Sequence, residues 1–228
     1  MNKENHQLSG SVSETRHRVE VFSDVICPWC FIGKRRLEKA VRSLNGRGRV
    51  EILWRPFELN PDMPREGMDR KAYRAAKFGS WEASEKLDSQ VAVVGTVEGI
   101  PFAFDRIERT PNTFDAHRLI WLAQQEGSQD MVVEALFQGY FIEGLDIGNR
   151  ETLINIAGAA GLHTERVERF LASDEDVASV REEQEKARRM GISGVPHFVI
   201  NDAYALSGAQ PSQTFVSLFD QAMKPTHV

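Results

Sequence analysis

The sequence predicts an α/β fold in which a βαβ unit and a ββα unit are separated by a large all-helical insertion. Three observations lead to this prediction. Strand, helix and strand patterns follow one another within residues 18–60, and helical periodicity without strand alternation fills residues 61–190. A hairpin pattern and a last helical pattern occupy residues 191–224. Residues 1–17 are predominantly polar, and we expect them to form a disordered tail.

The βαβ unit begins at residues 18–23, where valines occupy one face of a strand and the side chains between them occupy the other. A helical pattern then starts at Cys27-Pro-Trp-Cys30. It runs to the Asn45-Gly46 pair, which is typical of a helix C-terminus. Residues 50–54 alternate again and predict the second strand.

The insertion carries the pattern of amphipathic helices. Residues 132–140 and 153–160 have apolar side chains at i, i+3 and i+4, and Asn149 is the expected N-cap of the second helix. We expect both apolar stripes to face the core. The charged run 181–189 pairs acidic with basic residues at i, i+4, which is typical of an exposed helix face.

The ββα unit consists of two short strands and a helix. The strands are predicted at residues 197–200 and 204–207, joined by Asn201-Asp202, and Pro211 is a favourable start for the helix. Together with the βαβ unit, this arrangement is a split thioredoxin fold.

The composition excludes several classes of protein. The chain has 228 residues, a net charge of −5 and 41% hydrophobic residues, as a globular domain with an insertion does. Basic residues are not clustered, so we expect no nucleic-acid partner. The apolar runs fall far short of the roughly 20 residues that span a bilayer, and residues 1–17 lack the apolar segment of a signal peptide. We therefore expect a cytoplasmic protein with no membrane partner.

Cys27 and Cys30 are the only cysteines of the sequence, and they form a C-x-x-C motif. In a reducing cytosol such a pair is more often catalytic or metal-binding than a structural disulfide. A zinc site would need two further ligands at matching spacing, and none is evident because His117, His163 and His197 are isolated in the sequence. We predict a catalytic pair and no metal, with zinc and an incidental buried pair as the alternatives.

The predicted helix places the two thiols differently. Cys27 precedes the first turn, where free backbone N–H groups and the helix dipole stabilise a thiolate, so we expect its pKa to fall from about 8.5 to roughly 3.5–7.5. We predict Cys27 as the nucleophile. Cys30 lies on the apolar face, which favours the protonated thiol, and we predict it as the resolving thiol. Pro28 removes a backbone N–H and Trp29 is expected at the exposed tip, so both would tune thiolate stability and substrate contact.

Several motifs together resemble one known family. In chain order they are Phe22-Ser-Asp-Val-Ile-Cys-Pro-Trp-Cys-Phe-Ile-Gly-Lys34, Pro56-Phe-Glu-Leu-Asn-Pro61, Gly194-Val-Pro-His-Phe198 and Ser207-Gly-Ala-Gln-Pro211. The sequence resembles the DsbA-like thioredoxin family, specifically its cytosolic FrnE-like branch, which is related to 2-hydroxychromene-2-carboxylate isomerase and kappa-class glutathione transferase. The resemblance implies a protein disulfide oxidoreductase. It also implies a cis-proline loop, here Val195 and Pro196, that faces the C-x-x-C motif and binds substrate.

The segment from Thr110 to Arg118 belongs to the same resemblance. It suggests Asn112 and His117 as substrate-binding residues in a roof over the site. The residues alone also allow a helix cap for Asn112 and a packed helix histidine for His117. Some members of the branch have a second cysteine pair toward the C-terminus, which this sequence lacks, so activities that need a second dithiol are not expected.

The resulting hypothesis is exchange with protein or small-molecule thiols and disulfides, with glutathione as a redox co-substrate and no tightly bound cofactor. Two alternatives stay open. One is a glutathione-dependent isomerase or transferase, although those relatives usually carry serine at the position of Cys27. The other is a thiol-dependent module that binds extended peptides without catalysis.

Overall fold

The computed structural model of the protein describes residues 16–45 and 48–222. Its strands are β1 (Arg16–Ser23), β2 (Arg49–Pro56), β3 (Met68–Asp69), β4 (Arg109–Thr110), β5 (His197–Ile200) and β6 (Tyr204–Ser207). Its α-helices are α1 (Pro28–Ser43), α2 (Arg70–Phe78), α3 (Trp81–Val97), α4 (Phe114–Gln125), α5 (Gln129–Gln138), α6 (Arg150–Ala159), α7 (Thr164–Ala172), α8 (Val177–Arg189) and α9 (Ser212–Ala222). A 3₁₀ turn, η1 (Phe104–Arg106), and a π-helical turn, η2 (Gly139–Glu143), complete the helical elements.

Four strands form the central mixed sheet, in the order β2-β1-β5-β6. β1 and β2 are parallel, with Val19 in register with Ile52. β5 is antiparallel to β1, with Val19 opposite Ile200, and β6 is antiparallel to β5. β1 pairs with β2 of its own half on one edge and with β5 on the other, so the N-terminal and C-terminal halves of the fold meet between β1 and β5.

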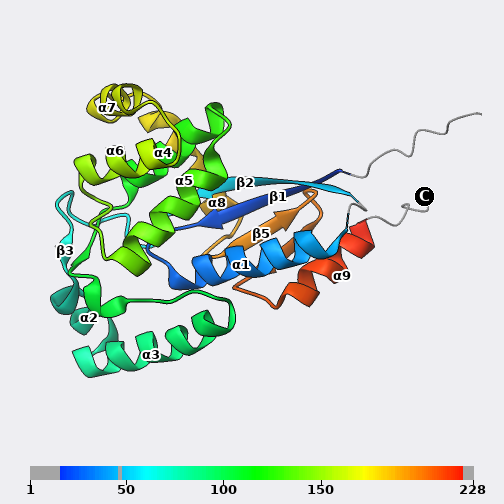
Figure 1. The fold of residues 1–228 in the computed structure, drawn as a ribbon, viewed down its shortest axis with the longest axis horizontal. Helices are drawn as coiled ribbons and strands as arrows, with labels where there is room; N and C mark the ends of the chain where they lie inside the picture. The colour runs from blue at the N-terminus through cyan, green and yellow to red at the C-terminus, as the bar shows by residue number, and fades with distance from the viewer. Residues whose placement is uncertain (1–15, 46–47, 223–228) are drawn as a thin grey trace, which may run out of the picture.

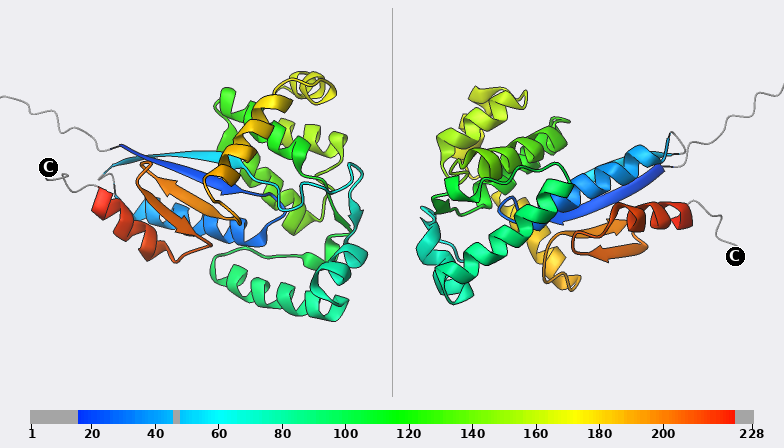
Figure 2. Two further views of the ribbon diagram at one scale, coloured as in Figure 1. Left: turned by 180° about the vertical axis from the view of Figure 1, so that it is seen from behind. Right: turned by 60° about the horizontal axis from the view of Figure 1, so that its bottom comes forward.

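Helices cover both faces of the sheet. α1 and α9 pack side by side on one face (Figure 1), and α8 lies on the other (Figure 2). β1 is buried on both faces: Val19 and Val21 belong to the main core, whereas Phe22 packs in a second cluster with Ala187 of α8. A sheet covered on both faces needs apolar residues at consecutive strand positions, and the end of β1 supplies them.

The insertion places helices around the N-terminal end of α1. α2 and α3 pack against each other and lie below α1 in Figure 1, while α4 to α7 lie above it. β3 and β4 form a two-residue antiparallel ladder within the insertion, pairing Met68 with Thr110. In the part of the chain that the structure describes, no helix combines the length and the apolar character that crossing a bilayer requires.

The α/β prediction and its thioredoxin topology are confirmed, with two differences. Residues 16 and 17 were expected in the tail but belong to β1, where His17 is buried and its Nδ1 lies 3.1 Å from the Asn201 amide nitrogen. Residues 1–15 of the predicted tail, and residues 223–224 of the predicted second half, lie outside the described residues. The β3–β4 ladder interrupts the insertion that was expected to be all-helical, because two-residue strands are too short to show alternation.

Candidate active site

Cys27 and Cys30 lie at the N-terminal end of α1. Cys27 is the N-cap residue and has extended backbone angles (φ −92°, ψ 111°). Its N–H donates to the Asp24 carbonyl (3.0 Å), and its own carbonyl accepts from the Cys30 N–H (3.0 Å). Pro28 occupies the first helical turn, where its missing N–H costs no helical hydrogen bond. The local sequence thus starts the helix at the motif, and both cysteines are free thiols.

The two thiols have different surroundings. Cys30 is 1% exposed and Cys27 is 5% exposed, whereas Trp29 between them is 40% exposed. Burial raises the pKa of the Cys30 thiol well above its ordinary value, and hydrogen bonding and charge from Cys27 raise it further. Contacts with the Ser23 side chain and the Asp24 backbone oppose this rise. The protonated state predicted for Cys30 agrees with these surroundings.

A loop from the C-terminal half of the fold faces the motif. Its Val195–Pro196 peptide bond is cis, as the resemblance implied. The Cys27 Sγ donates to the Val195 carbonyl oxygen at 3.6 Å. Gly33 permits the close packing of α1 on this loop, because a Cβ at that position would lie 3.1 Å from Pro196 and 3.0 Å from Phe198.

Three buried ionisable residues, Asp24, Glu58 and His117, lie near one another, and we call them the acid–histidine cluster. The Asp24 carboxylate accepts from the Leu59 N–H (2.7 Å), and His117 Nε2 lies 3.7 Å from Asp24 Oδ1. The Glu58 carboxylate accepts from Gln184 Nε2 at 2.9 Å. Burial raises the pKa of Glu58, and the hydrogen bond from Gln184 offsets part of the rise. The contact that His117 makes here is with Asp24, and its contact with substrate stays a prediction.

Within residues 16–45 and 48–222, no group of three or more His, Cys, Asp or Glu side chains is arranged to hold a metal ion.

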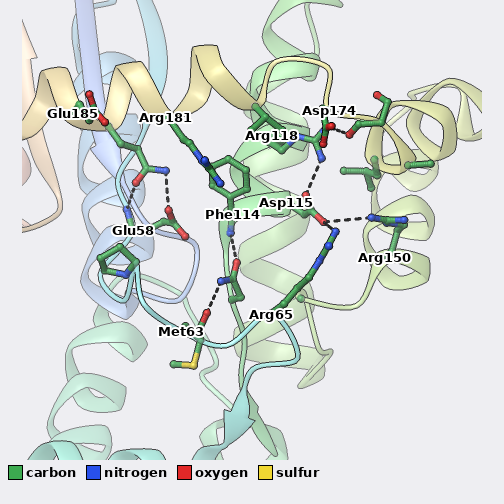
Figure 3. Close-up of a pocket in the computed structure, with 18 of the residues that line it drawn as sticks. Glu58, Met63, Arg65, Phe114, Asp115, Arg118, Arg150, Asp174, Arg181 and Glu185 are labelled. Atoms are coloured by element: carbon green, nitrogen blue, oxygen red, sulfur yellow. Dashed lines mark hydrogen bonds and ion pairs between the residues drawn. The ribbon is translucent and has the colours of Figure 1, made fainter.

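One cavity in the described part of the chain, which we call the larger cavity, contains neither cysteine. It has a volume of about 1100 Å³ and lies between the loop after β2 and helices α4, α7 and α8 (Figure 3). Asn112 lines this cavity, where its side chain donates to the Met63 carbonyl (2.7 Å) and accepts from the Phe114 N–H (3.0 Å). These contacts hold the start of α4, and substrate contact by Asn112 stays a prediction.

Three arginines surround Asp115 in the larger cavity (Figure 3). Arg118 donates to Asp115 at 2.9 Å, and Arg65 and Arg150 approach the same carboxylate to 3.9 Å. Arg118 is buried and also donates to the Phe170 carbonyl at 3.0 Å. It therefore joins α4 to α7, which is a structural role.

A second, smaller cavity borders Cys27. It has a volume of about 370 Å³, and Cys27, Pro28 and Trp29 form one side of it, while α2, α3, the two short helical turns, the loop after β2 and β4 contribute to the rest. The charged side chains that line it are Arg70, Arg74, Lys77 and Asp88. None of these four residues was predicted from the sequence as part of a site. The i, i+4, i+7 spacing of the three basic residues would have placed them on one helix face, but it does not reveal what that face meets.

Comparisons with known proteins agree with this geometry. The family model of the DSBA-like thioredoxin domain matches residues 18–220. The crystal structure of a probable DsbA oxidoreductase, SCO1869 from Streptomyces coelicolor, is 33% identical, with a TM-score of 0.84 and coverage of 93% of both chains. The uncharacterized protein YwbO of Bacillus subtilis (strain 168) is 26% identical over 210 residues, which are 90% of this chain and 97% of YwbO.

A further solved structure has low sequence identity, and its similarity supports only the shared fold. The cytosolic disulfide reductase DsbM from Pseudomonas aeruginosa, whose structure contains GSH, is 18% identical, with a TM-score of 0.65 and coverage of 91% of this chain and 100% of DsbM. The family model spans both halves of the thioredoxin fold and the insertion. The chain therefore belongs to the DSBA-like thioredoxin domain family, whose members are thioredoxin-fold oxidoreductases and isomerases.

Proposed function

We propose that this protein is a thiol–disulfide oxidoreductase in which Cys27 is the nucleophile and Cys30 is the resolving thiol. The unequal surroundings of the two thiols carry the proposal. Cys27 is the N-cap residue of α1 and lines a cavity, so a substrate in that cavity can meet its sulfur. Cys30 is 1% exposed, so a substrate reaches it only through Cys27.

The proposed reaction is a pair of exchange steps. The Cys27 thiolate attacks one sulfur of a substrate disulfide, and the other substrate sulfur leaves as a thiolate. Cys30 then loses its proton and attacks the Cys27 sulfur, which releases the second substrate thiolate. Two electrons pass from the protein dithiol to the substrate, and the Cys27–Cys30 disulfide forms. The reverse sequence oxidises a substrate dithiol.

The residues around the motif support substrate binding at the same place. The Val195 carbonyl lies 3.6 Å from the Cys27 sulfur, so an extended segment that pairs with the backbone of Val195 and Pro196 would bring its disulfide to Cys27. Trp29 is the exposed member of the motif and offers an aromatic surface to that segment. Pro28, between Cys27 and Trp29, restricts the backbone dihedral angle φ at that position.

Glutathione is the partner that we propose for resetting the pair. DsbM, which shares the fold, was solved with GSH. Two glutathione thiols would reduce the Cys27–Cys30 disulfide and form one glutathione disulfide, so no tightly bound cofactor is needed. A glutathione-dependent reset fits a cytoplasmic location, where glutathione keeps thiols reduced.

The first test is a redox titration of the protein in buffers of reduced and oxidised glutathione, with free thiols trapped and the product read by mass. We expect a reversible two-electron transition of the Cys27–Cys30 pair. Cys27→Ser should abolish disulfide exchange, and Cys30→Ser should accumulate mixed disulfides that are visible on non-reducing gels.

Three results would contradict the proposal. A wild-type exchange rate in Cys27→Ser would exclude Cys27 as the nucleophile. Absence of mixed disulfides in Cys30→Ser would exclude Cys30 as the resolving thiol. A pair that never closes, although glutathione binds the dithiol form, would favour the glutathione-dependent isomerase or transferase instead.

A further inference from the structure

The smaller cavity, beside Cys27, has apolar walls that face solvent. Its volume of about 370 Å³ falls within the roughly 300–1,000 Å³ that is usual for small-molecule sites. Four large apolar side chains that line it are 36–40% exposed: Trp29, Leu59, Phe78 and Leu87. Apolar surface gathered in one cavity is stabilised when an apolar ligand removes it from water.

The same cavity carries an excess of positive charge. Arg70 is 4% exposed and donates to one oxygen of Asp88 (2.7 Å), and Arg74 donates to the other (2.7 Å). Lys77 also lines the cavity, so three cations and one carboxylate are the charged groups of its wall. Burial lowers the pKa of the Arg74 guanidinium, Asp88 opposes the shift, and the charge of Arg70 adds to it. An anionic ligand would relieve this imbalance of charge.

The cationic and apolar parts of the wall are adjacent. The Arg74 guanidinium lies 4.8 Å from the centroid of the Phe78 ring, and the Arg70 guanidinium lies 5.8 Å from that of Phe104. A ligand that combines an aromatic ring with a carboxylate would therefore contact both parts at once, with the ring on the apolar side chains.

We propose that the site takes a small aryl disulfide that bears a carboxylate, an inference that rests on the oxidoreductase function proposed above. The ring packs on Phe78 and Leu87, the carboxylate pairs with Arg74 and Lys77, and one substrate sulfur meets Cys27. The protein dithiol gives two electrons and two protons to the substrate, which leaves as two aryl thiols. The Cys27–Cys30 disulfide is the other product. A small molecule is favoured over a protein substrate because the volume of the cavity suits one aryl ring of the disulfide.

The test compares two probes with the same rings, 4,4′-dithiodibenzoate and its neutral diamide. Each probe is mixed in excess with the reduced full-length protein, and the release of aryl thiol is followed in a single turnover. The dependence of the rate on probe concentration gives an apparent dissociation constant and a limiting rate. We expect the dibenzoate to bind about tenfold more tightly than the diamide, as a charge-assisted contact predicts.

Variants of the basic residues test which side chains contact the carboxylate of the probe. Arg74→Met should weaken binding of the dibenzoate about tenfold and change binding of the diamide less than about twofold. Arg74 also contacts Asp88, so its replacement could disturb the wall of the cavity. Lys77→Met, at an exposed position, is therefore a second variant, and it should weaken binding of the dibenzoate but not of the diamide. Lys71→Met is the matched control, since Lys71 lies on the same helix, is exposed and does not line the cavity.

The outcomes separate this inference from the function on which it rests. If neither probe oxidises the wild-type dithiol, the oxidoreductase function fails. If both probes react but bind with equal affinity, the proposal of an anionic aryl substrate is wrong. It is also wrong if Arg74→Met and Lys77→Met weaken binding of both probes to the same extent. Glutathione disulfide, which has carboxylates but no ring, should bind more weakly than the dibenzoate. Tighter binding of glutathione disulfide would overturn the aryl part of the proposal.

Discussion

Buried carboxyl groups are uncommon because water stabilises their charged form, and two of them belong to the acid–histidine cluster. Asp24 is fully buried, and Glu58 is 8% exposed. Burial raises the pKa of Glu58, so Glu58 keeps its proton to a higher pH in the folded chain than in the unfolded chain. Between the two pKa values the folded chain therefore binds more protons, and stability falls as the pH rises.

Glu58→Gln tests whether Glu58 makes this contribution to the pH dependence of stability. The contribution of Glu58 to the free energy of unfolding should decline from about pH 4.5, its ordinary pKa, upward through its raised pKa. The contribution of one such group has a slope of at most about 1.4 kcal/mol per pH unit. The variant should lack this contribution in urea unfolding between pH 4 and 7. Glu51→Gln, at an exposed position of β2, is the control, and parallel curves for wild type and Glu58→Gln would contradict the assignment.

Among the elements, α1 and α5 are joined by a group of ion pairs that ties the insertion to the thioredoxin half. The Lys34 ammonium is 3% exposed and contacts Asp130 (3.2 Å), Glu134 (3.1 Å) and Glu38. Burial by itself raises the pKa of Glu134, but the hydrogen bond from Arg35 and the nearby cations lower it to about 2. The helix that carries the thiols is therefore fixed to the insertion by charge as well as by apolar packing.

Lys34→Met should destabilise the protein by about 1–3 kcal/mol, because it removes a buried cation from partly exposed carboxylates that keep Arg35 as a partner. Urea unfolding at pH 7 measures the loss. Lys86→Met, at an exposed position of α3, should change the free energy of unfolding by less than about 0.5 kcal/mol. A loss below about 1 kcal/mol in Lys34→Met would show that the ion pairs contribute little to the α1–α5 contact.

The elements also show what local sequence patterns can predict. The strands expected at residues 197–200 and 204–207 coincide with β5 and β6, and Asn149 accepts from the Thr152 N–H as the N-cap of α6. These features depend on neighbouring residues and on periodicity. The position of Arg74 beside Cys27 was not predictable in this way, because it depends on how a helix of the insertion packs against the end of α1. The buried contact of His117 with Asp24 has the same origin.

At the scale of the whole molecule, the two halves of the thioredoxin fold meet at Phe198 of β5. This side chain is fully buried and stacks edge-on with Phe215 of α9, with ring centroids 4.8 Å apart. It also lies against Gly33 of α1, where a Cβ would be 3.0 Å away. One side chain thus connects the helix of the thiols, the sheet and the last helix.

Phe198→Ala should lower the free energy of unfolding by about 3–5 kcal/mol, since it removes a fully buried aromatic side chain and leaves a cavity. The loss of support for the neighbouring Pro196 loop should also slow thiol exchange. Val97→Ala, at a position that is 74% exposed, is the control and should change neither property. Stability close to that of the wild type would mean that the two halves do not depend on this contact.

The separation of the site along the chain has a consequence for the newly made protein. Cys27 and the Val195 carbonyl that it contacts are 168 residues apart. At a synthesis rate of about 5–20 residues per second, a ribosome needs on the order of ten to thirty seconds to make the segment between them. Until the segment is complete, Cys27 lacks the Val195 carbonyl that it contacts in the folded protein. The geometry around the C-x-x-C motif therefore forms only after the C-terminal loop and strands have been made.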